Sequence, residues 1–422
     1  MDIGYKILDI MIVKGYILGD MEALPSKKRT SKSKEERTHM KKFSKLVLSL
    51  LLVGTVGLAG CSNNGGETAG AATPETTAEA TAEAAPTTPE ATQAASTGLS
   101  KATVLSADKL PITGIGTTVA TDIKAKGSYK IGYIAKNTTN PYMVAQSAGV
   151  AKAGEDMGFE AITQAPSTAD SVEEQVKLME NMIQQGANAI IVHCADSNGI
   201  MPGVRAAQDA GVIVLTIGTP AAEDTFLRTG VDYYETGYTI AKDMAEALGG
   251  KGNLIILEGP AGAANAIERL NGINDALKEY PDITVVASQT ANFKRTEGMS
   301  VTENLLQKYT DVQGIIGAND ESALGAVQAL TAAGVEGVLV SGFDGSVDAA
   351  NAVLNGDMFE SYNTDPYGSG YIAAAYAVRY LDDGVEPEAK FIPFPTSNND
   401  PLINSKTVQD YINNYAWFNA VQ

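Results

Sequence analysis

Short apolar runs recur along the chain from Lys130 onward, separated by longer stretches whose apolar residues repeat with the period of a helix. Continuous apolar runs are typical of strands buried on both faces, whereas the longer stretches are typical of amphipathic helices. Successive runs start roughly 25 to 30 residues apart, the length of one strand plus one helix, which predicts parallel βαβ winding. The runs are KIGYIA, FEAIT, NAIIV, VIVLT, NLIIL, ITVVA, QGIIG and GVLVS.

One intervening stretch carries several helix signals at once. Ser171 and Glu174 have the spacing of a capping box, and Gly186 stands where a helix commonly ends. The sequence therefore predicts a helix between Ser171 and Gly186. The apolar residues expected on its buried face are Val172, Val176, Met179 and Ile183.

The strand and helix units fall into two groups that divide near Gly230-Val231-Asp232-Tyr233. About nine units are more than one open sheet usually contains, so we expect an α/β fold with two lobes. Ligands of open parallel sheets bind beyond the carboxyl ends of the strands. The facing strand ends of the two lobes should therefore form a binding cleft.

Residues 40–61 have the order of a bacterial lipoprotein signal: lysines, an apolar stretch, then small residues before a cysteine. The apolar stretch is too short for a stable membrane span, which favours a signal peptide over residues 40–60. Leu58-Ala59-Gly60-Cys61 resembles a lipobox, whose cysteine becomes the lipidated first residue of the mature chain. We therefore expect an extracytoplasmic protein that the lipid on Cys61 anchors to the cell membrane.

Two segments flank this signal. Residues 1–39 are basic and show no helix or strand pattern, so we interpret them as an upstream extension of the true start. Residues 61–127 hold the lipidated cysteine and then a segment rich in Thr, Ala, Pro and Glu. Such a composition has little to bury, which predicts a disordered tether. Residues 101–127 are less biased in composition, and the sequence leaves open whether they pack on the folded body.

Charge and residue counts exclude several classes of function. Residues 1–60 hold 11 Lys or Arg and 6 Asp or Glu, so the remainder has 20 basic and 44 acidic residues and a net charge near −24. Such a field repels nucleic acid and anionic lipid headgroups. The two cysteines, Cys61 and Cys194, lie in unrelated contexts, and His39 and His193 are the only histidines. Neither a disulfide framework nor a metal site or other cofactor is expected.

The stretch IIGANDESAL, residues 315–324, runs from an apolar strand pattern into polar residues and then into a helix pattern. It lacks the glycine spacing of a phosphate-binding loop. Asp320 and Glu321 are neighbours in a predicted first helical turn, where their side chains diverge, so they make a poor hydrolytic pair. We assign both acids to capping the helix and its dipole, and Asn319 to ligand contact.

Other strand ends offer further candidates. Asp344 lies between glycines, where it is either a turn residue or an acceptor for the vicinal hydroxyls of a polyol, and we favour the second interpretation. Tyr142 and Phe293 are either core residues or aromatic walls of a sugar site. His193 either makes a structural hydrogen bond or contacts the ligand. We expect Cys194 and Trp417 to be buried packing residues.

From Tyr129 to about Tyr415 the chain resembles the type I periplasmic sugar-binding proteins of ABC importers, in the ribose- and galactose-binding branch. The resemblance implies two Rossmann-like lobes with parallel sheets, joined by three hinge crossings. The N-terminal lobe would comprise 128–232 plus about 364–394, and the C-terminal lobe 233–363 plus about 395–422. The stretches that carry it are IGYIAKNTTNPYM, GANAIIVHCADSNG, ERLNGI, SQTANFKRTEGM, IIGANDESALGAVQAL and VSGFDGSVDA.

The resemblance also implies where the ligand binds. The expected contacts are Asn140, Tyr142, Met143, Phe293, Asn319 and Asp344, together with His193, Asp196, Thr219 and Thr364. The chain departs from ribose binders at Gly218-Thr219, where they have an Asp-Arg pair, and at Ile267, where they have a ligand-contacting Arg. With Lys136 and Arg295 as the only cations expected near the motifs, neutral polyols should bind best, amine-bearing sugars next, and anionic solutes should be rejected.

The sequence thus predicts a monomeric, non-enzymatic lipoprotein that captures a small neutral sugar or polyol and delivers it to the membrane subunits of an ABC permease. The alternative is a solute-sensing receptor that signals to a membrane kinase or chemoreceptor. Permease or kinase genes beside its own would separate the two. A lactose-repressor-type regulator shares the implied fold but would carry a helix-turn-helix instead of a signal and lipobox.

Overall fold

The computed structural model describes residues 112–113, 116–384, 386–387, 389–393 and 401–421, all within one unit, Thr92–Gln422. The predicted upstream extension, signal peptide, lipidated Cys61 and most of the predicted tether lie outside the described residues. None of the helices in the described part of the chain is long and apolar enough to span a membrane.

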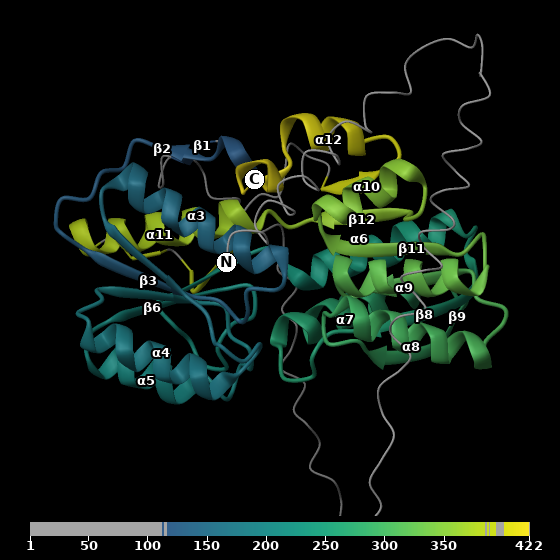
Figure 1. The fold of residues 1–422 in the computed structure, drawn as a ribbon, viewed down its shortest axis with the longest axis horizontal. Helices are drawn as coiled ribbons and strands as arrows, with labels where there is room; N and C mark the ends of the chain where they lie inside the picture. Colours follow the sequence, from purple (N-terminus) through teal and green to yellow (C-terminus); the bar gives the residue numbers. More distant parts are fainter. Residues whose placement is uncertain (1–111, 114–115, 385, 388, 394–400, 422) are drawn as a thin grey trace, which may run out of the picture. The chain divides into compact units, whose positions relative to one another are not determined.

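The first lobe is built on a six-stranded sheet in the order β13-β7-β6-β5-β3-β4, in which all neighbouring strands are parallel. Helices α3 and α11 pack together on one face, and α4 and α5 cover the other (Figure 1). The strands are β3 (Lys130–Ile134), β4 (Glu160–Gln164), β5 (Ala189–Val192), β6 (Ile213–Ile217), β7 (Leu227–Gly230) and β13 (Phe391–Pro393). The helices are α3 (Pro141–Met157), α4 (Val172–Gln184), α5 (Met201–Asp209) and α11 (Pro366–Asp383).

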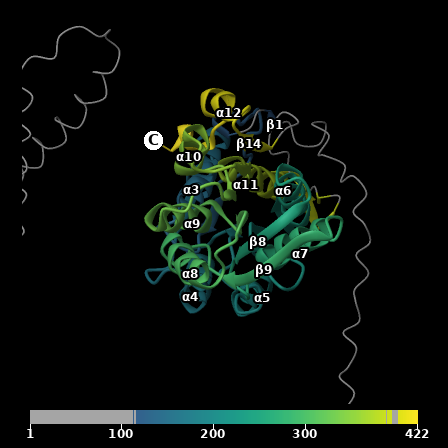
Figure 2. The ribbon, with the colours of Figure 1, turned by 90° about the vertical axis from the view of Figure 1, so that its right-hand side faces the viewer.

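The second lobe repeats this plan with the order β14-β12-β11-β10-β8-β9, in which only β14 is antiparallel to its neighbour. Figure 2 shows β8 and β9 between the helix pairs α6–α7 and α8–α9. The strands are β8 (Lys251–Glu258), β9 (Asp282–Thr290), β10 (Gly314–Gly317), β11 (Leu339–Asp344), β12 (Glu360–Asn363) and β14 (Leu402–Asn404). The helices are α6 (Tyr233–Ala247), α7 (Ala264–Leu277), α8 (Arg295–Lys308), α9 (Asp320–Ala333), α10 (Val347–Asn355) and α12 (Val408–Asn414).

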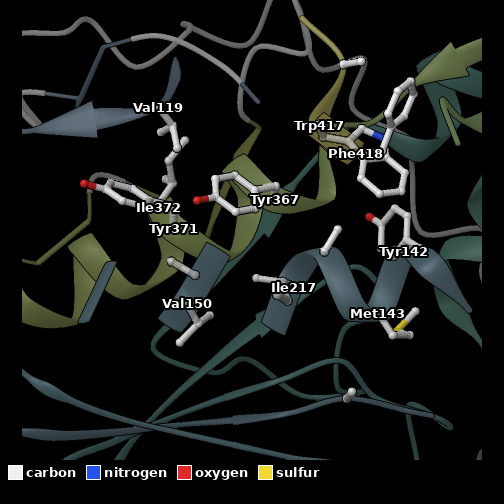
Figure 3. Close-up of a cluster of buried hydrophobic side chains, with 14 of the residues drawn as sticks. Val119, Tyr142, Met143, Val150, Ile217, Tyr367, Tyr371, Ile372, Trp417 and Phe418 are labelled. Atoms are coloured by element: carbon white, nitrogen blue, oxygen red, sulfur yellow. The ribbon is translucent and has the colours of Figure 1, made fainter. Parts of the chain in front are cut away.

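Among the described strands, the chain crosses between the two six-stranded sheets three times: between β7 and β8, between β12 and β13, and between β13 and β14. The short C-terminal helix η2 (Trp417–Ala420) then packs against α3 and α11 of the first lobe. Figure 3 shows side chains of α3, α11 and η2 gathered in one buried hydrophobic cluster. The predicted α/β fold with two parallel-rich sheets is confirmed.

The predicted helix after Ser171 is present as α4. The Ser171 hydroxyl accepts a hydrogen bond from the backbone N–H of Glu174 at 3.3 Å, and Gly186 follows the helix with a φ of 78°. The return half of a capping box is missing, because the Glu174 carboxylate binds Ser167 and Thr168 instead.

The segment before the first lobe packs on it. Strands β1 (Ile112–Thr113) and β2 (Ala120–Thr121) pair antiparallel around a short helix, η1 (Gly116–Thr118). Val119 and Ile123 are buried, and the Ala125 N–H donates to the Met157 carbonyl at 2.8 Å. The sequence left open whether residues 101–127 pack on the folded body. Within the described part of the chain, residues 116–127 do so, because Val119 and Ile123 join a buried hydrophobic cluster, and the predicted tether therefore does not extend to residue 127.

Candidate ligand-binding site

An inner pocket lies where the strand ends of the two lobes face each other. About 310 Å³ of space there, open solvent included, is free of atoms. Most of its lining residues follow the carboxyl ends of strands, as expected for parallel sheets. The lining residues are Lys136, Asn140, Tyr142, Met143 and His193 from the first lobe and Tyr233, Asn265, Arg269, Phe293, Asn319 and Asp344 from the second.

The structure brings seven of the ten predicted contact residues into this pocket: Asn140, Tyr142, Met143, His193, Phe293, Asn319 and Asp344. The other three do not line it. Asp196 lines an adjoining outer chamber, where its carboxylate accepts the N–H groups of Asn198 and Gly199. Thr219 is buried behind Asn265, and Thr364 is buried with no hydrogen-bond partner for its hydroxyl.

Asn319 both caps α9 and lines the pocket. Its side-chain oxygen accepts from the Ser322 N–H at 3.0 Å, and its amide group donates to the Phe293 carbonyl at 3.3 Å. A short polar side chain at a helix start can thus hold a neighbouring pocket loop in place.

Asp320 is not a cap, so that prediction is wrong. It is 1% exposed and accepts from the Ser346 N–H at 2.7 Å and the Ser361 hydroxyl at 2.6 Å. Burial raises the pKa of Asp320 to about 7. Its neighbour Glu321 forms an ion pair with Arg295, so its charge does not interact with the N-terminus of α9 alone. Both acids follow the cap residue, so tertiary partners decide what they bind.

Asp344 ends β11 in a backbone conformation that few residues other than glycine adopt, with a φ of 118°. Its carbonyl accepts from the buried Trp417 indole N–H at 2.8 Å, so the predicted packing residue holds the backbone of the predicted ligand residue. Burial, and then the nearby Asp320, raise the pKa of the Asp344 carboxyl well above its ordinary value, while Arg269 and Lys136 oppose the shift. Phe293 also has a positive φ, 59°. Such strain is typical of functional sites that the surrounding structure holds in place.

The prediction that Lys136 and Arg295 are the only cations near the binding motifs is wrong. Arg269, on α7, is 2% exposed and lines the pocket. Its guanidinium lies 4.2 Å from the ring centre of Phe343 and 5.1 Å from that of Tyr233, and it donates to the Ala318 carbonyl. Its Nε has no hydrogen-bond partner. Arg295, one of the two cations that the sequence suggested, lines the outer chamber and pairs with Glu321 and Asp348.

Lys136 is the second buried cation of the pocket. It is 5% exposed, its ammonium lies 3.4 Å from the Thr219 hydroxyl, and it lies 5.2 Å from the ring centre of Phe293. Burial lowers the pKa of Lys136 to about 8. No ion pair among the described residues includes Lys136 or Arg269. Both cations therefore keep hydrogen-bond donors available to a molecule in the pocket.

The sequence carried a weak signal for two of the missed residues. Asn265 and Arg269 are one helical turn apart, and the buried residues Gly272, Ile273 and Ala276 continue the same face of α7. A polar side chain on the buried face of a helix needs a partner inside the protein or a ligand. This periodicity marks Asn265 and Arg269, whereas nothing comparable marks Tyr233.

The lobes touch each other beside the pocket. The Ser197 N–H donates to the Gly262 carbonyl at 3.0 Å, and both carboxylate oxygens of Glu268 bind the Arg228 guanidinium, at 2.9 and 2.6 Å. A guanidinium with two parallel hydrogen bonds to a carboxylate is a well-defined contact. The pocket is therefore covered on this side by direct contacts between the lobes.

These features define a class of protein. Two α/β lobes are in contact around a small pocket, which is lined by one carboxylate, two cations without an ion-pair partner, three amides and aromatic faces. Such a lining suits the binding of a small molecule with many hydrogen-bonding groups. Among the described residues there is no cluster of side chains that could hold a metal ion.

Comparison with known proteins identifies the family. Residues 131–385 match the periplasmic binding protein domain, and the chain belongs to this family. This confirms the resemblance seen in the sequence.

Three named relatives illustrate the similarity. The chain is 33% identical over 254 residues to the ribose import binding protein of Bacillus subtilis, covering 60% of this chain and 81% of that one. It is 31% identical over 262 residues to the D-apiose import binding protein of Actinobacillus succinogenes, covering 60% and 82%. It is 38% identical over 194 residues to the xylitol-binding protein of Mycolicibacterium smegmatis, covering 45% of this chain and only 55% of that relative.

Solved structures show the same arrangement. An ABC transporter solute-binding protein of Actinobacillus succinogenes with bound D-allose superimposes with a TM-score of 0.63 at 32% identity, covering 67% of this chain and all of that one. A solute-binding protein of Bacillus halodurans with bound myo-inositol gives a TM-score of 0.62 at 27% identity, covering 68% and 99%.

Proposed function

We propose that this protein captures a small sugar or polyol in the inner pocket and delivers it to the membrane subunits of an ABC importer. The observation that carries the proposal is a set of buried charged groups that form no ion pair among the described residues: the Asp344 carboxylate with the Arg269 and Lys136 cations. A molecule with several hydroxyls donates to the carboxylate and accepts from the cations. The relatives named for ribose, D-apiose and xylitol support this class of ligand.

The buried charges also revise the expected order of ligands. Amine-bearing sugars drop from second place, because Lys136 and Arg269 would repel an added cation in a pocket whose described lining holds Asp344 as its only carboxylate. That single carboxylate also argues for binding without catalysis, since hydrolysis of glycosides commonly uses a pair. Neutral sugars and polyols satisfy both kinds of group and remain first.

A thermal-shift screen across neutral, amino and acidic sugars and polyols tests the proposal. A neutral member should give the largest rise in melting temperature, because a ligand at a hundred times its dissociation constant stabilises by about 2.7 kcal/mol. Small-angle scattering of the unlabelled protein with that ligand should then report a monomer. If no member of the panel shifts the melting temperature, the proposed ligand class fails, and a largest shift from an amino sugar would overturn the charge argument.

We further propose that the lipid on Cys61 anchors the protein to the outer face of the cell membrane. The order of lysines, apolar residues and Leu58-Ala59-Gly60-Cys61 supports this. Replacing Cys61 by Ser should move the protein from the membrane fraction to the soluble extracytoplasmic fraction, since acyl chains would no longer hold it. A Cys61→Ser protein that stays with the membrane would contradict the anchor, and Cys194→Ser, at the buried free cysteine, is the matched control.

A further inference from the structure

A line of polar side chains crosses from one lobe to the other beside the pocket. Gln146 Oε1, on α3, lies 2.8 Å from His193 Nδ1, and His193 Nε2 lies 3.3 Å from the Thr219 hydroxyl. The Thr219 hydroxyl in turn donates to Asn265 Oδ1, on α7 of the second lobe, at 2.8 Å. All four side chains are at least nine-tenths buried. We call Gln146, His193, Thr219 and Asn265 the polar bridge.

The backbone at Gly218 makes room for the polar bridge. Gly218 follows β6 with a φ of 69°, and a Cβ atom added there would collide with the His193 ring. The ring therefore occupies the space where a side chain at position 218 would otherwise lie, and Thr219 is directed across the cleft. Glycine accommodates both the positive φ and the close contact with the ring. Gly218 therefore allows His193 and Thr219 to take these positions.

The polar bridge forms one wall of the pocket. His193 and Asn265 line the pocket, whereas Thr219 does not and is shielded behind them. The Lys136 ammonium also lies 3.4 Å from the Thr219 hydroxyl, so that hydroxyl has protein partners on three sides. A ligand cannot extend through this wall without separating the Thr219 and Asn265 side chains, which would leave buried polar groups unpaired.

We propose that Asn265 sets the length of the ligand that the pocket accepts. The Thr219 hydroxyl holds the Asn265 side chain, which closes the pocket on the β6 side. The ligand therefore extends between Asp344 and Asn140 and ends at the Asn265 amide. This inference rests on the proposed function, since it concerns the sugar or polyol bound in the same pocket. It assigns Asn265 and Thr219 a role in selecting among neutral ligands, which the charged residues of the pocket do not supply.

The test uses linear polyols that differ only by successive hydroxymethylene groups: glycerol, erythritol, xylitol, sorbitol and a heptitol. Calorimetric titration of the unmodified protein should show an affinity that increases with polyol length up to one member of the series and decreases for the next longer polyol. For the Asn265→Ala variant we compare two affinities: that for the polyol which the unmodified protein binds best, and that for the next longer polyol. The ratio of the second affinity to the first should rise at least tenfold, which corresponds to about 1.4 kcal/mol. Thr219→Val keeps the volume but releases Asn265, so it should change the preference in the same direction.

Asn271→Ala provides the control, because Asn271 is exposed on the same helix. It should leave the length preference unchanged. If Asn265→Ala weakens every polyol by the same factor, Asn265 is an ordinary ligand contact and the inference is wrong. If it changes no affinity, the polar bridge has no part in selection. Failure of the unmodified protein to bind any sugar or polyol would instead reject the proposed function, and this inference with it.

Discussion

Replacing Asp344 by Ala should weaken ligand binding at least tenfold while the protein still folds. The substitution removes the only carboxylate among the described pocket residues and leaves ligand hydroxyls unpaired in an enclosed site, at a cost of about 1–3 kcal/mol. The fold should survive because Trp417 binds the Asp344 carbonyl, which the substitution keeps. Calorimetric titration gives the affinity, and thermal unfolding without ligand gives the stability.

Two further variants make this result specific. Asp357→Ala removes an exposed carboxylate of the same lobe and should change neither quantity. Asp344→Asn keeps the shape and should retain part of the affinity, because an amide oxygen still accepts one of the ligand's hydrogen bonds. Unchanged affinity in Asp344→Ala would show that Asp344 is a turn residue that does not bind the ligand.

Replacing Arg269 by Met should abolish most of the binding and leave the stability of the ligand-free protein unchanged or higher. Hydrogen bonds from a charged group contribute about 1.5–3 kcal/mol, so affinity should fall by roughly one to two orders of magnitude. Met keeps the apolar contact with Phe343 and Tyr233. A buried guanidinium without an ion-pair partner is costly, so a well-packed apolar residue often stabilises a protein at such a position.

The matched control is Arg205→Met, at an arginine of the first lobe whose side chain is 59% exposed. It should alter neither affinity nor melting temperature. A large fall in the melting temperature of ligand-free Arg269→Met would assign Arg269 to holding the Ala318 loop and not to the ligand. Binding that persists at full strength would show that the ligand does not reach the guanidinium.

The sequence alone determined the alternation of strands and helices, the division into two groups and the position of most pocket residues. These features follow from local rules. Buried parallel strands read as continuous apolar runs, and the residues just after them must lie at one edge of the sheet. Asn140, Phe293, Asn319 and Asp344 could therefore be predicted without coordinates. The helix after Ser171 follows in the same way from its capping residue and its apolar face.

Only the tertiary structure decided which residues away from the strand ends reach the pocket and which distant partners the buried polar groups bind. Arg269 and Asn265 reach the pocket from inside α7, so their place depends on how that helix packs beside α6. Asp320 looks like a cap in sequence, but its partners Ser346 and Ser361 lie 26 and 41 residues further along the chain. The link from Thr219 to Asn265 joins the two lobes. Hydrogen bonds between distant segments form only when packing brings the groups within reach, and local patterns carry no record of such partners.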